Sequence, residues 1–218
     1  MKSNLLGPIL PLFRGCAIAC ALAASAHAAL IVDYNLGTSQ NSTTWSTLNN
    51  TNPTRTSDVG SDAGTLTVNS PGYQASLGIY SPTGDYSITI TQSSTFDLQT
   101  ALLQLDIAAS GVLPYGTGPL LSYNGGSQEL AATYFGTNGT ETRGGFNYTG
   151  AAWQWDLSGI ADTVTSITIT VPVQMHSAIS AAQIDSGSSN LAVVPEPSMM
   201  GLTLLGGGLL VARRRRVV

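Results

Sequence analysis

The sequence predicts an all-β protein, an antiparallel β-sandwich or jelly roll, with one apolar segment before the sheet-forming region and another after it. Three observations predict this fold class. Apolar and polar residues alternate with a period of two, turn-forming motifs separate the alternating segments, and no helical periodicity stands out between residues 29 and 194. The 218-residue length accommodates one domain at residues 29–190, flanked by processing segments at 1–28 and 191–218.

Three segments show the clearest alternation, and Ser, Thr, Gln or Asp residues occupy the positions between their apolar residues. The apolar faces are Tyr86, Ile88 and Ile90; Leu103, Leu105 and Ile107; and Ile167, Ile169 and Val171. Shorter strand candidates are residues 30–34, 65–68, 75–80, 130–135 and 178–184, whereas the polar stretch 37–63 is expected to be loop. Turn motifs at 70–72, 81–84, 124–126, 138–139 and 143–145 separate them. Many short strands with Thr- and Ser-rich outer faces favour a sandwich.

Charge is scarce and unevenly distributed, since only 9% of the residues are Asp, Glu, Lys or Arg. Six of the eight basic residues lie near the two ends, so the stretch between has only Arg55 and Arg143. All acidic residues except Glu196 lie between Asp33 and Asp185. This acidic domain lacks the basic stripe that binds phosphate backbones, so we expect no nucleic-acid partner.

Both cysteines, Cys16 and Cys20, lie in the N-terminal apolar segment. If that segment is removed, the mature protein has no disulfide, no thiolate metal site and no thiol nucleophile. The domain must then depend on an ordinary hydrophobic core, which a chain of this length can supply.

Residues 1–28 have the three parts of a secretory signal peptide. Lys2 and Arg14 make a positive beginning, residues 16–24 form a short apolar run, and Ala26-His27-Ala28 is a small-x-small cleavage site. Cleavage after Ala28 is expected, with cleavage after Ala26 as an alternative. The other interpretation is a retained N-terminal anchor, although the run is short for a bilayer.

The C-terminal 28 residues combine a motif, an apolar run and a basic cluster. Pro195, Glu196 and Pro197 precede residues 199–212, which carry no charge, and Arg213, Arg214, Arg215 and Arg216 follow. As a helix, residues 199–212 would be about 21 Å long, short of the roughly 30 Å hydrocarbon core. The arginines would hold the C-terminus on the cytoplasmic side, so that residues 29–194 lie outside the inner membrane.

These three elements, in this order, resemble the PEP-CTERM sorting signal over about the last 25 residues. The resemblance implies that a membrane enzyme, exosortase, recognises Pro195, Glu196 and Pro197 and cuts nearby, while the helix and arginines hold the substrate in the inner membrane. Such proteins occur in Gram-negative bacteria that make exopolysaccharide and biofilm. The expected location is therefore transient inner-membrane anchoring, followed by the cell surface or the extracellular matrix. The alternative is a rigid linker before a plain tail anchor.

Trp153 to Ile160, the Thr/Ile strand and residues 176–185 also resemble the closing strands of β-sandwich ectodomains often found before such tails. This resemblance implies the fold, since those ectodomains mostly lack an assigned activity. Trp153 and Trp155, two residues apart on one strand, would face the same side. They predict either a sugar-stacking platform, hence a carbohydrate-binding module for exopolysaccharide, or core residues.

Few residues favour catalysis or cofactor binding. His176 is the single histidine of the expected mature domain, and neither a G-x-S-x-G elbow nor a zinc-ligand spacing nor a P-loop occurs. We therefore expect a non-enzymatic protein without a cofactor. A secreted glycan-active enzyme stays a further hypothesis, because the acidic residues could supply the two carboxylates that such an enzyme requires. Asp58 and Asp62, in a glycine-containing loop, are weak calcium candidates or turn-capping residues.

Overall fold

The computed structural model describes residues 30–60, 62–109 and 118–192, and within them every regular element is a β-strand paired antiparallel to its neighbours. The signal peptide, the Pro195–Pro197 motif, residues 199–212 and the arginine cluster lie outside these ranges. The ranges contain no helix with the length and apolar character needed to cross a membrane.

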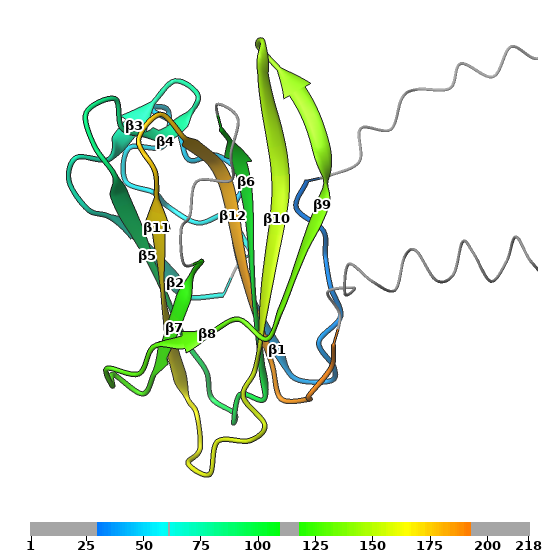
Figure 1. Ribbon diagram of the computed structural model, residues 1–218. Coiled ribbons are helices and arrows are strands. Elements are labelled where there is room, and N and C mark those ends of the chain that lie inside the picture. The colour runs from blue at the N-terminus through cyan, green and yellow to red at the C-terminus, as the bar shows by residue number, and fades with distance from the viewer. Residues whose placement is uncertain (1–29, 61, 110–117, 193–218) are drawn as a thin grey trace, which may run out of the picture.

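The strands form two sheets (Figure 1). The seven-stranded sheet has the order β3-β4-β12-β6-β10-β9, and β1 also pairs with β12. Its strands are β3 (Tyr73–Ala75), β4 (Gly78–Tyr80), β12 (Ala178–Gly187), β6 (Thr100–Ala108), β10 (Phe146–Asp156), β9 (Tyr134–Arg143) and β1 (Gln40–Trp45). The five-stranded sheet has the order β2-β5-β11-β7-β8, formed by Gly64–Val68, Tyr86–Ser93, Ser166–Val173, Leu120–Tyr123 and Leu130–Ala131.

The two sheets enclose a common hydrophobic core, which makes the fold sandwich-like. The inward faces of β5 and β11 contribute Ile88, Ile90 and Ile169, and β6 contributes Leu103 and Leu105 from the other sheet. Burial alternates residue by residue along β5 and β11, which confirms the period-two prediction for both strands.

The strand β6 differs from β5 and β11, because both of its faces are buried. Its inward residues join the core, and residues 30–38 run across the outer face of the larger sheet (blue in Figure 1). Gln104 on that face accepts a hydrogen bond from the Val32 amide (2.9 Å) and donates one to the Val32 carbonyl (2.7 Å). Gln104, on the polar side of β6, therefore pairs with a covering segment and does not face water.

Two glycines allow this segment to approach the sheet closely. A Cβ atom at Gly150 would lie 2.3 Å from the carbonyl oxygen of Leu30, and one at Gly187 would lie 2.5 Å from that of Leu36. Neither distance is tolerable between a side chain and fixed backbone, so both positions require glycine. Leu36 then packs against Leu102 beneath the segment.

Several predicted boundaries need correction. Residues 30–34 form no strand, because their polar backbone groups bond to side chains such as Gln104 rather than to a neighbouring strand. The expected loop 37–63 contains β1, which pairs with β12 through Gln40–Trp45. Residues 75–80 contain the end of β3 and the whole of β4, and residues 130–135 contain β8 and the start of β9.

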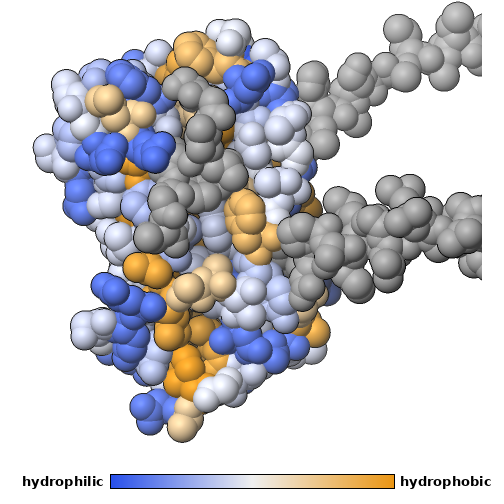
Figure 2. All heavy atoms as spheres, viewed as in Figure 1, coloured by the Kyte–Doolittle hydropathy of each residue, from blue (hydrophilic) through white to orange (hydrophobic). Residues whose placement is uncertain are grey.

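Hydrophobic residues gather at one end of the face shown in Figure 2, in the region where Figure 1 has β7 and β8. Tyr123 of β7, Leu130 of β8 and Phe135 of β9 are partly buried and pack against the main core. The core therefore reaches the surface where the smaller sheet ends.

Candidate functional site

The structure places Trp153 and Trp155 in the core between the sheets, where they are 3% and 1% exposed. The ring of Trp153 lies 5.4 Å from that of Phe135, and the Trp155 indole donates to the Leu130 carbonyl at 2.9 Å. A sugar-stacking platform needs an open ring face, which neither tryptophan offers. Their predicted glycan-binding role is therefore withdrawn in favour of the alternative, that they are core residues.

The two calcium candidates use their oxygens to attach the loop before β2 to β1. The Asp58 carboxylate accepts hydrogen bonds from the Ser46 amide (3.1 Å) and hydroxyl (3.1 Å), and Asp62 accepts one from the Ser42 amide (2.7 Å). Within the described ranges, no three His, Cys, Asp or Glu side chains are grouped so that they could hold a metal ion. The bonded residues are 12 and 20 positions apart in the chain, so these aspartates attach the loop to β1 and do not cap a local turn.

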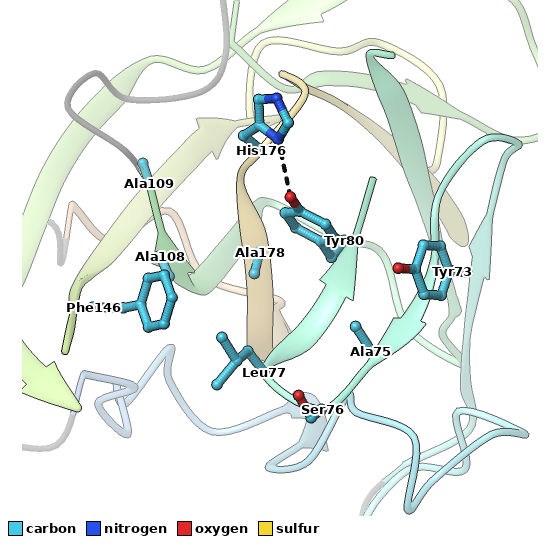
Figure 3. A pocket seen from close by; sticks show the side chains of 10 residues that line it. All are labelled: Tyr73, Ala75, Ser76, Leu77, Tyr80, Ala108, Ala109, Phe146, His176 and Ala178. Carbon is cyan, nitrogen blue, oxygen red and sulfur yellow. Dashed lines mark hydrogen bonds between the residues drawn. The ribbon is translucent and has the colours of Figure 1, made fainter. Parts of the chain in front are cut away.

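A cavity of about 490 Å³ opens at one end of the larger sheet, on its outer face (Figure 3). Tyr80, Phe146 and His176 line it, together with Leu77 from the turn between β3 and β4. Tyr73 and Phe146 lie at its rim and are 49% and 51% exposed. The volume falls within the roughly 300–1,000 Å³ of small-molecule pockets, so this cavity is the strongest candidate site.

Strand register explains the hollow. Across the sheet, Tyr73 pairs with Tyr80, Tyr80 with Ala178, Ala178 with Ala108, and Ala108 with Tyr148. Paired residues stand side by side on one face, so two alanines lie between large aromatic side chains. Figure 3 shows the alanines on the floor, with Phe146 on one side and Tyr80 and Tyr73 on the other.

Polar contacts hold the aromatic wall in place. The Tyr80 hydroxyl lies 2.9 Å from Nδ1 of His176, and the Tyr73 and Tyr80 rings meet edge to face at 6.4 Å. His176 occupies the turn between β11 and β12 with φ at 68°, and its amide donates to the Ser81 carbonyl. His176, the single histidine of the expected mature domain, is therefore an exposed residue that lines the cavity.

A smaller cavity of about 190 Å³ adjoins the first, because Ser76 and Leu77 line both. Its other lining residues carry hydroxyl, amide or guanidinium groups, with Tyr148 as the aromatic member: Ser46, Thr47, Asn49, Arg143, Tyr148 and Ser180. The β3–β4 turn thus separates an apolar hollow from a hydrogen-bonding one.

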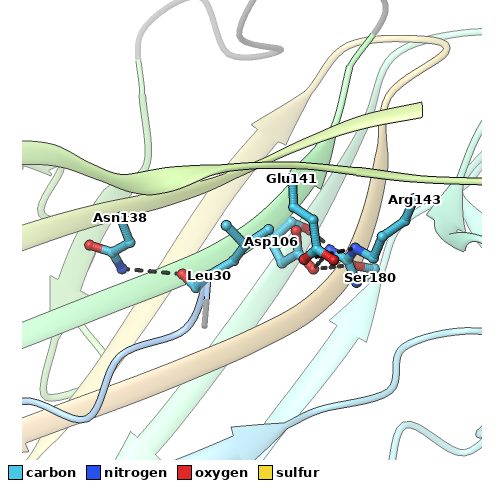
Figure 4. Close-up of polar contacts among 6 residues, drawn as sticks. All are labelled: Leu30, Asp106, Asn138, Glu141, Arg143 and Ser180. Atoms are coloured by element: carbon cyan, nitrogen blue, oxygen red, sulfur yellow. Dashed lines mark hydrogen bonds and ion pairs between the residues drawn. The ribbon is translucent and has the colours of Figure 1, made fainter. Parts of the chain in front are cut away.

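Arg143 is the charged residue of the smaller cavity, and acidic groups surround it (Figure 4). Its guanidinium pairs with Asp106, which is 4% exposed, and its Nε lies 3.6 Å from the Glu141 carboxylate. Ser180 donates to the same Asp106 oxygen at 2.6 Å, and the guanidinium stacks 3.9 Å over the Tyr148 ring. With one cation and two carboxylates, this cluster carries no net positive charge.

A second buried acid, Asp185, lies on the same face of the larger sheet. Burial raises the pKa of its carboxyl to about 6, although hydrogen bonds from Ser42, Gln183 and Gln104 favour ionisation and the nearby Asp33 carboxylate opposes it. The Gln183 amide reaches both carboxylate oxygens, at 3.0 and 2.9 Å. These donors are neutral, so the carboxylate is solvated by amides and a hydroxyl.

Sequence reasoning did not find this pair of cavities. Tyr73 and Phe146 lie more than seventy positions apart in the chain and meet through strands that are not neighbours in sequence. The turn motif at 143–145 is a local signal for the β9–β10 hairpin, whereas the β3–β4 turn falls inside residues 75–80, which the sequence predicts to be one strand. Comparison with known proteins found no matching family model, no matching curated protein and no matching solved structure.

Proposed function

We propose that this chain is an exported, non-enzymatic protein of the cell surface or extracellular matrix, released from the inner membrane by an exosortase. One observation carries the proposal: a signal-peptide pattern ending at Ala28 and a Pro-Glu-Pro, apolar and tetra-arginine tail enclose one domain. Together they orient that domain away from the cytoplasm.

The character of the domain supports this role. An antiparallel β-sandwich or jelly roll without a cysteine suits an ectodomain that folds outside the inner membrane on its hydrophobic core alone. The short interval between the domain and the tail also fits the proposal. Leu191 still contacts the sheet, and Pro195 follows only four residues later.

The environment of the buried acids supports a non-enzymatic role. Asp106 is paired with Arg143 and Ser180, and Asp185 is enclosed by neutral donors beneath residues 30–38. Neither carboxyl lines the two cavities. A glycan-active enzyme would need two carboxyl groups facing one bound sugar.

The proposal is tested by changing the motif in a bacterium that produces an exosortase. Glu196→Ala, or deletion of Arg213–Arg216, should leave a longer precursor in the membrane fraction. The first change removes a residue that the enzyme recognises, and the second removes the charges that orient the tail in the membrane. Immunoblotting of membrane, surface and medium fractions measures the outcome, and mass spectrometry locates the new C-terminus.

Glu129→Ala is the matched control, since Glu129 is exposed on the loop between β7 and β8. This variant should be processed like the unaltered protein. If Glu196→Ala and the arginine deletion were also processed normally, the sorting proposal would be wrong and a plain tail anchor would replace it.

A further inference from the structure

We propose that the two adjoining cavities form one binding site for a neutral saccharide, the larger cavity holding a sugar ring and the smaller one hydrogen-bonding its neighbour. This inference gives the proposed surface protein a ligand and moves glycan binding from the buried tryptophans to a site on the outer face. It does not depend on how the protein is sorted.

The first step of the argument is the shape and chemistry of the larger cavity. Sugars present flat C–H faces, which pack on aromatic rings. Tyr73 and Phe146 offer half-exposed rings at opposite sides of a floor made by Ala108 and Ala178. No Asp, Glu, Lys or Arg side chain lines this cavity, and its imidazole, that of His176, is hydrogen-bonded to the Tyr80 hydroxyl.

The second step is the adjoining polar surface. The hydroxyl groups of a sugar lose hydrogen bonds to water when the sugar binds. The protein must replace these bonds with donors and acceptors close to the aromatic rings. Beyond the Ser76–Leu77 turn, Thr47, Asn49 and Ser180 supply such groups. Ser180 donates to Asp106 and the Asn49 side-chain oxygen accepts from Thr51, so the Ser180 oxygen can still accept and the Asn49 nitrogen can still donate to a sugar hydroxyl, as can the Thr47 hydroxyl. A disaccharide or longer chain can span both cavities.

The third step is charge. Arg143 would attract a uronic acid or a phosphate if it were free, but Asp106 and Glu141 flank it. The cluster of these three residues has one positive and two negative charges, so an anionic ligand gains no net attraction. A neutral saccharide is the ligand class that matches rings, hydroxyl groups and charge together.

The test uses isothermal titration calorimetry on the full chain in lipid nanodiscs, because detergent would compete for the apolar cavity. The ligands are tetrasaccharides of glucose, xylose, mannose and galactose in α and β linkages, with tetragalacturonate and laurate for comparison. At least one neutral tetrasaccharide should bind, and more tightly than tetragalacturonate does. Binding of laurate alone, tighter binding of tetragalacturonate, or no saccharide binding would overturn the inference.

Variants locate the site. Tyr73→Ala and Phe146→Ala should each weaken binding roughly tenfold, since each removes a stacking surface. Thr47→Val should weaken it a fewfold by removing one hydroxyl while preserving side-chain shape. Val59→Ala, at a fully exposed loop position, is the control and should bind normally. Circular dichroism checks each fold, and Phe146→Ala serves if Tyr73→Ala does not fold.

If all four variants bound alike, the site would lie elsewhere and the inference would fail. Chromatography of the titrated tetrasaccharides separates this inference from the proposed function. Intact sugar agrees with a binding protein, whereas cleavage products would contradict the non-enzymatic role while leaving the location of the site to the variants.

Discussion

At the scale of single residues, the carboxyl of Asp185 is placed where ionisation is costly. It lies on the outer face of β12, beneath residues 30–38, and its hydrogen-bond donors are Gln183, Gln104 and Ser42. No cation appears among the groups that shift its pKa. The folded protein therefore binds a proton at Asp185 more tightly than the unfolded chain does.

The sign of the stability effect follows from that difference. The pKa is about 6 in the folded state and about 4 in the unfolded chain, so folding takes up a proton between these values. The free energy of unfolding should fall as pH rises from about 4 to 6, and the carboxylate's penalty should be complete at pH 7.5.

Asp185→Asn removes that penalty, because an amide stays neutral at every pH. We expect the variant to gain on the order of 1–3 kcal/mol in urea unfolding at pH 7.5 and almost nothing at pH 4. Asp162→Asn, at an exposed position, should change neither value. Equal gains at both pH values would show that the effect is not one of ionisation.

At the scale of elements, residues 30–38 act as a cover for the larger sheet. Without them, the outer face of β6 would expose Leu102 beside buried polar groups. Gln104 is the main attachment, because its amide serves both backbone groups of Val32 and also accepts from Asn138 at 2.7 Å. A further bond joins Asn138 to the Leu30 carbonyl (Figure 4).

Gln104→Met keeps the side-chain volume but removes the three bonds that Gln104 makes to Val32 and Asn138. The variant should lose about 1–3 kcal/mol of unfolding free energy, since the partly buried Val32 backbone groups would lose their partners. Hydrogen exchange measured by mass spectrometry should accelerate in residues 30–38 and stay unchanged in β5. Gln174→Met, at an exposed turn position, is the control, and a Gln104→Met protein with unaltered exchange would refute the attachment role.

At the scale of the whole molecule, the folded domain and the predicted sorting tail are joined by a very short connection. The Leu191 amide donates to Thr100 at 3.3 Å, its carbonyl accepts from Gln154, and Asn190 bonds to Asp156 and Ser158. Three residues lie between Leu191 and Pro195, so the distance from one to the other is at most about 14 Å. An enzyme that cuts near the motif must work close to the larger sheet.

Lengthening that connection should therefore speed processing, if the sorting proposal is right. A ten-residue Gly/Ser insertion between Ala192 and Val193 should raise the processed fraction severalfold at early times of a pulse-chase experiment. The same insertion between Gly125 and Gly126, in an exposed loop, should have no effect. Unchanged kinetics with the first insertion would mean that the folded domain does not hinder the enzyme.

The sequence by itself determined the all-β character and the inward faces of β5 and β11, because period-two alternation is a local property of the chain. Its two apolar ends likewise led to the sorting proposal through composition and order alone. The cavities and the buried acids could not be predicted in this way. Only the tertiary structure decided that Ala178 stands beside Ala108 and that residues 30–38 cover Asp185. Pairing between distant strands depends on the packing of the whole sandwich, which no local pattern encodes.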